Sequence, residues 1–115
     1  MPHGDDVTRL HHMLDAARKA VAFTRGRCRA DLDENELLAL ALARLMEVLG
    51  EAAKGISAGL RGKHPGIPWK EIAGTRDRLI HGYFDVDLDV IWAIVDSDLP
   101  PLIADLETLI RDDDS

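Results

Sequence analysis

Apolar residues recur in the middle of the chain at the spacing of a packed helix. The steps between them alternate between four and three residues over nearly three heptads, at Leu38, Leu42, Leu45, Leu49, Ala52 and Ile56. Such spacing gives an α-helix one continuous apolar seam, which is stable only when other helices cover it. We therefore predict a helix that begins at Asp31 or Asp33, ends near Ser57 and packs in an antiparallel bundle.

One further helix is predicted on each side of this segment. The first runs from about Asp5 to Phe23, because Asp5 or Asp6 can cap it and an apolar stripe follows. After the central helix comes a loop that contains several Gly and Pro residues. The next helix then runs from Trp69 to about His81, and Gly82 can act as its C-terminal stop.

The last part of the chain is predicted to form two short helices. One begins at Asp85 or Asp87 and carries apolar residues at helical spacing. Pro100 and Pro101 predict a break, and Asp98 can cap a last helix that runs to about Ile110. The predicted fold class is therefore all-α, an antiparallel four- to five-helix bundle.

Length and composition limit what this bundle can be. The 115 residues fit one domain, residues 1–115, of which residues 112–115 form a frayed acidic tail. A single cysteine, Cys28, rules out an internal disulfide. No signal peptide is apparent, and no apolar run approaches the roughly 18 residues of a membrane span. We expect a cytoplasmic protein with no membrane partner.

The charge of the chain argues against broad electrostatic binding to nucleic acid. It carries 21 acidic and 14 basic residues, for a net charge of −7. This balance does not exclude a local basic site. The basic residues cluster between Arg25 and Arg29 and again between Arg61 and Arg78.

The segment around Arg76 and His81 combines the side chains that chemistry requires. On a regular helix Asp77 and His81 are four residues apart, so a hydrogen bond between them is feasible and would raise the pKa of His81. Arg76 and His81 would lie roughly 140° apart around that helix and would not touch. Arg76 must therefore reach around the helix, or a second subunit must complete the site.

A histidine that titrates near neutrality, beside a fixed arginine, suits RNA cleavage. The 2′-OH attacks the adjacent phosphate while the histidine moves protons at the attacking or leaving oxygen. The arginine holds phosphate oxygens and stabilises the added negative charge. This chemistry requires no metal and no cofactor, and the 2′-OH would discriminate RNA from DNA.

The run Arg76-Asp-Arg-Leu-Ile-His81-Gly-Tyr83 resembles the Arg-x4-His-x-Tyr signature of HepT-like toxins, within the HEPN superfamily. Three other stretches are similar to the same family: Gly50 to Lys54, His64 to Gly74 and Phe84 to Trp92. The polar residue after the arginine, often Asn in the family, is Asp77 here.

This resemblance implies a HEPN helical bundle that is usually homodimeric. It implies metal-independent RNA endonuclease activity, with Arg76 and His81 from two subunits facing a shared cleft. The chain would be the toxin of a type VII-like toxin–antitoxin pair. Its partner would be a minimal nucleotidyltransferase of the MntA type, which transfers AMP to Tyr83 and silences the toxin.

Other interpretations stay open beside this one. The chain could be a non-catalytic HEPN dimer that serves as binding partner or substrate of the nucleotidyltransferase, or an interaction bundle without chemistry. Glu51 could orient His81 or Arg76, or it could pair with Lys54 or Glu47 in solvent.

Three other groups of residues are interpreted as structural. We interpret Trp69 and Trp92 as core or interface aromatics rather than base-stacking platforms. The arginines between Arg25 and Arg29 are interpreted as a solvated loop rather than a track that steers RNA. His3, His11 and His12 lack the spacing of a metal site.

Overall fold

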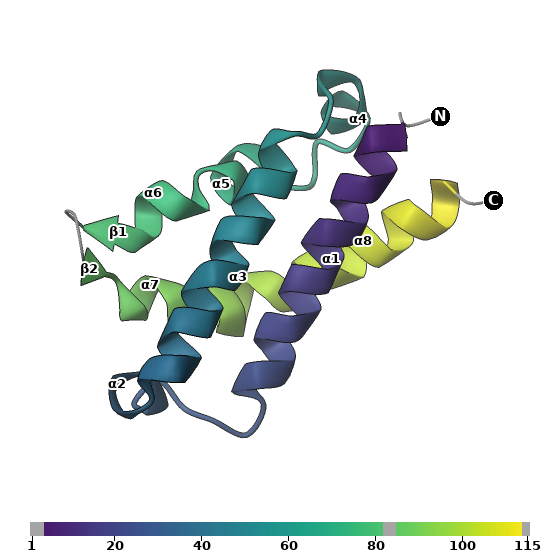
Figure 1. Cartoon of the computed structure of the whole chain (residues 1–115). Helices are drawn as coiled ribbons and strands as arrows, with labels where there is room; N and C mark the ends of the chain where they lie inside the picture. Colours follow the sequence, from purple (N-terminus) through teal and green to yellow (C-terminus); the bar gives the residue numbers. More distant parts are fainter. Residues whose placement is uncertain (1–3, 82–84, 114–115) are drawn as a thin grey trace.

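The structure, a computed structural model, describes residues 4–81 and 85–113. Two long helices, α1 (Gly4–Thr24) and α3 (Glu36–Lys54), run antiparallel to each other, with α2 (Asp31–Glu34) in the connection between them (Figure 1). A third helical stretch crosses behind them and consists of α7 (Leu88–Ala93), η1 (Ile94–Asp98) and α8 (Leu99–Asp113). The predicted all-α bundle is confirmed.

The buried apolar residues form one core cluster, to which α1, α3 and α8 contribute most. The seam predicted on α3 lies in this core, with one change of register. Met46 is fully buried, whereas the neighbouring Leu45 is only partly buried. In a straight helix seven residues fall about 20° short of two full turns, so a strict heptad line drifts around the helix. Helix α3 also packs against several elements besides α1, so more than one line of its residues is covered.

The predicted central helix is divided in two at Asn35. The backbone of this residue is extended, and its side-chain oxygen accepts a hydrogen bond from the Leu38 N–H at 3.0 Å. An asparagine that offers its own acceptor to the backbone favours a helix start over a helix interior. The start predicted at Asp31 or Asp33 therefore belongs to α2, and the long helix begins at Glu36.

The central helix also ends earlier than predicted. Helix α3 ends at Lys54, and Ser57 caps a further helix, α4 (Ala58–Lys63), in a region expected to be a loop. Asp6 of α1 is buried and accepts hydrogen bonds from the Ser57 N–H at 2.9 Å and from the Ser57 hydroxyl at 2.6 Å. Asp6 therefore joins α1 to α4, whereas we expected Asp5 or Asp6 to act as the cap of α1.

The helix predicted from Trp69 to His81 is not continuous. It consists of α5 (Trp69–Ala73) and α6 (Thr75–Leu79), which meet at Gly74. The Thr75 hydroxyl donates to the Ile72 carbonyl at 2.6 Å and so competes for a backbone acceptor at the junction. After Leu79 the chain forms strand β1 (Ile80–His81).

Strand β1 pairs with strand β2 (Asp85–Val86) in an antiparallel ribbon. The register places Ile80 opposite Val86 and His81 opposite Asp85. The Asp87 N–H donates to the Leu79 carbonyl at 2.6 Å, which extends this connection to the end of α6. The ribbon explains why helical geometry does not reach His81.

The two prolines near the C-terminal end do not break the chain into separate helices. Asp87 caps α7 by accepting from the Val90 N–H at 3.1 Å. Of the two predicted starts, Asp85 and Asp87, the second is therefore confirmed. The helix then widens into η1, where the Leu99 N–H bonds to the Ile94 carbonyl five residues earlier.

Pro100 and Pro101 lie in the first turn of α8, where their missing N–H groups leave no interior bond unmade. Asp98 lies within η1 and is not the expected cap. Helix α8 then continues to Asp113, past the predicted end near Ile110.

Candidate functional site

Arg76 lies on α6 with its side chain exposed. Among the residues that the structure describes, no carboxylate pairs with its guanidinium. Arg76 therefore belongs to a short helix and not to the long helix predicted from Trp69 to His81, because α5 and α6 are separate. A solvent-facing guanidinium can instead donate to the oxygens of a phosphate in a forked contact.

His81 follows two residues after the end of α6. Its backbone belongs to β1, so Asp77 and His81 are not the helical pair that a four-residue spacing predicted. The angular separation predicted between Arg76 and His81 fails for the same reason, and with it the geometric argument for a second subunit. The His81 side chain and the whole of Tyr83 lie outside the described residues.

Glu51 lies on α3, which contacts both α5 and α6. The face of α3 toward α5 is marked by Gly50, where an added Cβ atom would come within 3.3 Å of the Ile72 carbonyl oxygen. Glu51 itself is exposed, pairs with Lys54 at 3.9 Å and shares a surface hollow with Arg9. These contacts match the alternative interpretation, in which Glu51 is a solvated partner of Lys54.

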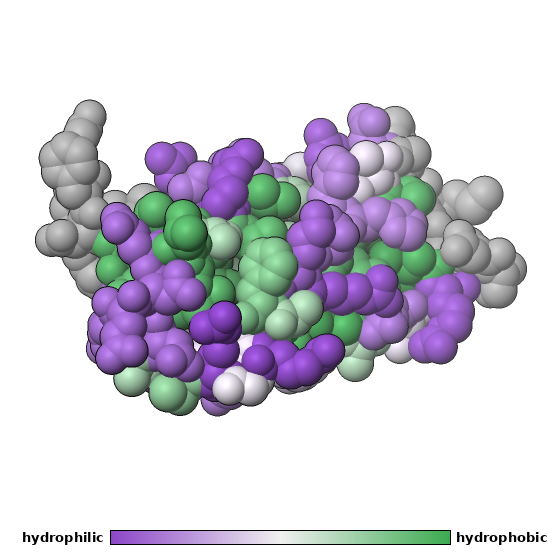
Figure 2. Space-filling model, turned by 60° about the horizontal axis from the view of Figure 1, so that its bottom comes forward, coloured by the Kyte–Doolittle hydropathy of each residue, from purple (hydrophilic) through white to green (hydrophobic). Residues whose placement is uncertain are grey.

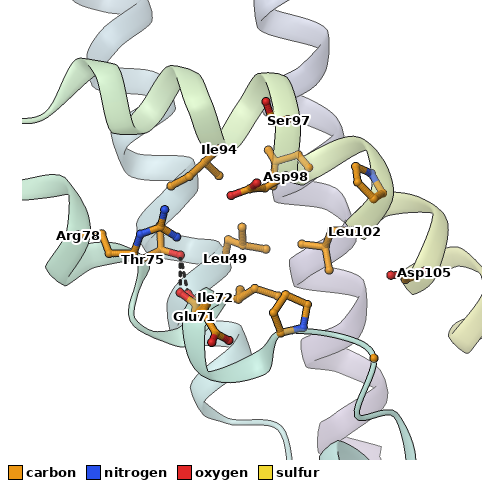
Figure 3. Close-up of a pocket in the computed structure, with 14 residues that line it drawn as sticks. Leu49, Glu71, Ile72, Thr75, Arg78, Ile94, Ser97, Asp98, Leu102 and Asp105 are labelled. Atoms are coloured by element: carbon orange, nitrogen blue, oxygen red, sulfur yellow. Dashed lines mark hydrogen bonds between the residues drawn. The ribbon is translucent and has the colours of Figure 1, made fainter.

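A groove of about 430 Å³ lies beside α6, the helix that carries Arg76, between α5–α6 and η1–α8. Figure 3 shows Arg78 and Thr75 on one side of it and Ile94, Ser97 and Asp98 on the other. Its floor is apolar, with Leu49 of α3 and Leu102 of α8. Carboxylates on its rim come from Glu71, Asp98 and Asp105. The groove therefore suits an apolar or cationic occupant better than a phosphate.

Thr75 was not singled out from the sequence, although it shapes this groove. It is buried, and its hydroxyl donates to the carbonyl oxygens of Ile72 at 2.6 Å and Glu71 at 3.3 Å (Figure 3). Such bonds bend or end a helix. The pair Gly74-Thr75 in the middle of a predicted helix was the available signal for this junction.

The aromatic residues have the structural roles expected of them. Trp69 is buried in the core, and its indole N–H donates to the His64 carbonyl at 2.9 Å. Trp92 is partly buried and packs against the core.

The arginines after α1 do not behave alike. Arg25 and Arg27 are exposed, in agreement with a solvated loop. Arg29 instead connects α2 to α7, since its Nε donates to Asp89 at 2.6 Å and its Nη1 to Asp33 at 3.1 Å. The hydrogen bond with Asp89 is the main cause of the raised pKa of Arg29.

The surface of the described residues is largely polar. Figure 2 shows apolar side chains lying between hydrophilic ones on the face that it presents. Three large apolar side chains in the described part of the chain are exposed: Phe23, Leu37 and Leu40. No described helix has the length and apolar character that crossing a bilayer would need. In the described ranges, His, Cys, Asp and Glu side chains do not gather into a group of three or more that could hold a metal ion.

The sequence profile of a family described as "Ribonuclease HepT-like" matches residues 13–109, which include Arg76, His81 and Tyr83. Relatives of similar length cover nearly all of the chain. The Methanocaldococcus jannaschii protein named "Putative RNase MJ1216" is 36% identical over 97% of this chain and 93% of its own length. The "Probable ribonuclease HepT" of Thermococcus cleftensis is 39% identical over 87% of this chain and 91% of its own length.

A third relative has a similar identity and coverage. The Caldanaerobacter subterraneus protein named "Putative RNase TTE0752" is 34% identical over 89% of this chain and 91% of its own length. No solved structure was found to match the chain.

Proposed function

Because the chain belongs to the HepT-like ribonuclease family, we propose that it is a metal-independent RNA endonuclease whose catalytic residues are Arg76 and His81. The observation that carries the proposal is the exposed guanidinium of Arg76 on α6. It has no carboxylate partner among the described residues and lies on the short helix that ends two residues before His81. Asp77, also exposed on α6, is a supporting residue that can influence the charge of the site.

The proposed reaction needs only the RNA and these side chains. The 2′-oxygen of one nucleotide bonds to the adjacent phosphorus while the bond from phosphorus to the 5′-oxygen of the next nucleotide breaks. His81 takes the 2′-OH proton or supplies the proton that the leaving 5′-oxygen needs. The Arg76 guanidinium binds the non-bridging oxygens, on which negative charge increases in the transition state.

We further propose that Tyr83 is the site of AMP transfer by a minimal nucleotidyltransferase of the MntA type. The phenolic oxygen would bond to the α-phosphorus of ATP, pyrophosphate would leave and the phenolic proton would pass to solvent or a base. Tyr83 is two residues from His81 in the sequence. A bulky phosphodiester so close would block RNA and repel its phosphates, which is how an antitoxin could silence a toxin.

A homodimer is part of the same proposal, and it rests on the family resemblance. The expectation is that Arg76 and His81 of two subunits face one cleft. A symmetric dimer would place the same surface of each copy in contact, because two-fold interfaces are self-complementary. Light scattering after size exclusion would measure the mass directly, and a monomer that cleaves RNA would contradict this part.

An RNA-cleavage assay with EDTA present tests the main proposal. Wild type, Arg76→Ala, His81→Ala and the control Arg44→Ala would be compared on total tRNA and mRNA, each checked for folding. We expect Arg76→Ala to lose about 10²- to 10³-fold in rate and His81→Ala about 10²- to 10⁴-fold. Arg44 lies on α3 and pairs with Glu47, so its replacement should leave cleavage unchanged. Equal cleavage by all four proteins would indicate contamination and contradict the site.

The charge of the C-terminal part favours a second candidate function. Residues 85–115 contain ten of the 21 acidic residues and, in Arg111, a single basic one. An acidic segment of this extent opposes RNA and suits a protein partner. The chain would then be a non-catalytic dimer that binds the nucleotidyltransferase or is its substrate. A stable complex with that enzyme and no RNA cleavage by wild type, with Tyr83 shown by mass spectrometry to be unmodified, would establish this alternative.

A further inference from the structure

The lysines and arginines of this protein fall into two groups by their partners. On the long helices α1 and α3, ion pairs hold most of them: Arg18 with Glu107, Lys19 with Asp15, Arg44 with Glu47 and Lys54 with Glu51. Residues 61–78 carry five cations, and within the described part of the chain none of these five pairs with a carboxylate: Arg61, Lys63, Lys70, Arg76 and Arg78.

These five cations lie on three helices that follow one another in the chain. Figure 1 shows α4 past the C-terminal end of α3, then α5 and α6, which contact α3, and β1 at the far end. Lys63 lies at the end of α4, Lys70 on α5 and Arg76 on α6. The same stretch holds only two acidic residues, Glu71 and Asp77, in a chain whose net charge is −7. Residues 61–78 therefore carry a local excess of positive charge, in the segment that contains Arg76 and leads to His81.

A hollow in the surface lies on this segment, at α4 and α5. It measures about 430 Å³, and its lining includes Arg61 and Lys70, one carboxylate from Glu71, and Trp69 with the prolines of the α4–α5 loop. The Arg61 Nε atom is buried and has no hydrogen-bond partner among the described residues. Burying a polar atom without a hydrogen-bond partner costs free energy. No described carboxylate offsets this cost for Arg61.

We propose that Arg61, Lys63 and Lys70, which we name the basic edge, bind backbone phosphates of single-stranded RNA to one side of the bond cleaved at Arg76 and His81. This inference rests on the proposed ribonuclease function and deepens it. Unpaired cations release counterions when they meet phosphates, whereas cations already paired with carboxylates gain much less. The basic edge lies on two successive helices, α4 and α5, and precedes Arg76 on α6; cations spread in this way match a linear polyanion better than they match a compact anion.

The binding test separates the basic edge from cleavage. A labelled RNA of about a dozen nucleotides, 2′-O-methylated throughout so that it cannot be cut, would be titrated by fluorescence anisotropy with EDTA over a series of salt concentrations. The variant Lys63→Gln/Lys70→Gln would be compared with the control Lys19→Gln/Lys54→Gln. Both remove two exposed lysines from helices, and thermal melts would establish that both remain folded.

We expect the basic-edge variant to bind the RNA about tenfold more weakly at low salt. The slope of log K against log salt should fall in magnitude by about 1.4, which is two phosphate contacts at roughly 0.7 each for a single strand. The control should keep the slope of wild type. Equal slopes for the two variants would overturn the inference, as would a wild-type protein that does not bind RNA at low salt.

A dinucleotide substrate tells the failure of this inference from the failure of the proposed function. It contains only the cleaved phosphodiester, so wild type and both variants should cleave it equally. Cleavage of the dinucleotide with identical long-RNA slopes would leave the function intact and refute the basic edge. If wild type did not cleave the dinucleotide but the long-RNA slopes were as predicted, the basic edge would stand and the proposed function would be refuted. If the basic-edge variant lost binding to a polyglutamate peptide but not to RNA, the surface would bind acidic proteins and the inference would be wrong.

Discussion

The pair of long helices, α1 and α3, and the short elements beside it differ in their regularity and in the pairing of their cations. Helices α1 and α3 bury continuous apolar stripes against each other, and their exposed cations are mostly held by carboxylates. From Ser57 to His81 the chain forms only short elements, separated by Gly and Pro residues, and its cations have no such partners in the described structure. Both regions contribute to the core, but the cations without carboxylate partners are concentrated in the short elements.

The first prediction tests the stability of the long-helix pair. Leu42 on α3 is completely buried, so Leu42→Ala should lower the free energy of unfolding by about 2–5 kcal/mol through lost burial and a residual cavity. Urea denaturation would measure the change. Leu40→Ala is the matched control on the same helix, since that side chain is 57% exposed, and it should cost less than about 1 kcal/mol. Similar losses for both variants would contradict the assigned core face.

The second prediction tests the contact between the two regions. A Cβ atom at Gly50 would lie 3.3 Å from the Ile72 carbonyl oxygen of α5 and 3.5 Å from that of Ala73. Gly50→Val should therefore push α5 away from α3 and cost about 1–3 kcal/mol, measured by urea denaturation. Cleavage should fall as well, because α6 follows α5 directly.

Gly62 provides the control for this substitution. It lies in α4, and nothing is within 4 Å of a Cβ atom added there. Gly62→Ala should stabilise the protein by up to about 1 kcal/mol through helix propensity alone. A Gly50→Val protein as stable and active as wild type would show that α5 does not depend on close contact with α3.

The third prediction concerns the link between α1 and α4. Ser57 both caps α4 and donates to the buried carboxylate of Asp6. Ser57→Ala removes both hydrogen bonds of this hydroxyl and should lower the free energy of unfolding by about 1–2 kcal/mol, measured in a thermal or urea melt. Ser57→Thr keeps the hydroxyl and should recover most of the loss. Equal stability of the Ala and Thr variants would contradict the role of this hydroxyl.

The smallest expected change in stability belongs to Arg76. Because no described carboxylate pairs with it, Arg76→Ala should alter the free energy of unfolding by less than about 0.5 kcal/mol while it abolishes most cleavage. Lys54→Gln breaks an exposed ion pair and should have a similarly small effect on stability, with no effect on cleavage. A large loss of stability in Arg76→Ala would mean that this residue is structural.

Local sequence signals predicted the long helices and failed where tertiary contacts compete with them. The stripe on α1 and the seam on α3 repeat over several turns, so periodicity placed both helices to within a few residues. Asn35, Ser57 and Thr75 act through single side-chain hydrogen bonds to the backbone, which leave no periodic trace. The expectation of a continuous helix up to His81 failed because β2, which follows in the sequence, offers β1 a partner strand.

Residue order alone was enough to predict the fold class, the helices that form the core and the Arg-x4-His-x-Tyr pattern that names the family. These properties depend on repeated or adjacent residues, and local chemistry is enough to state them. The folded molecule was needed to learn which cations keep carboxylate partners, which partner Glu51 takes and how α5 and α6 pack against α3. Those properties depend on distances between residues far apart in the chain, which packing of the core sets and residue spacing does not contain.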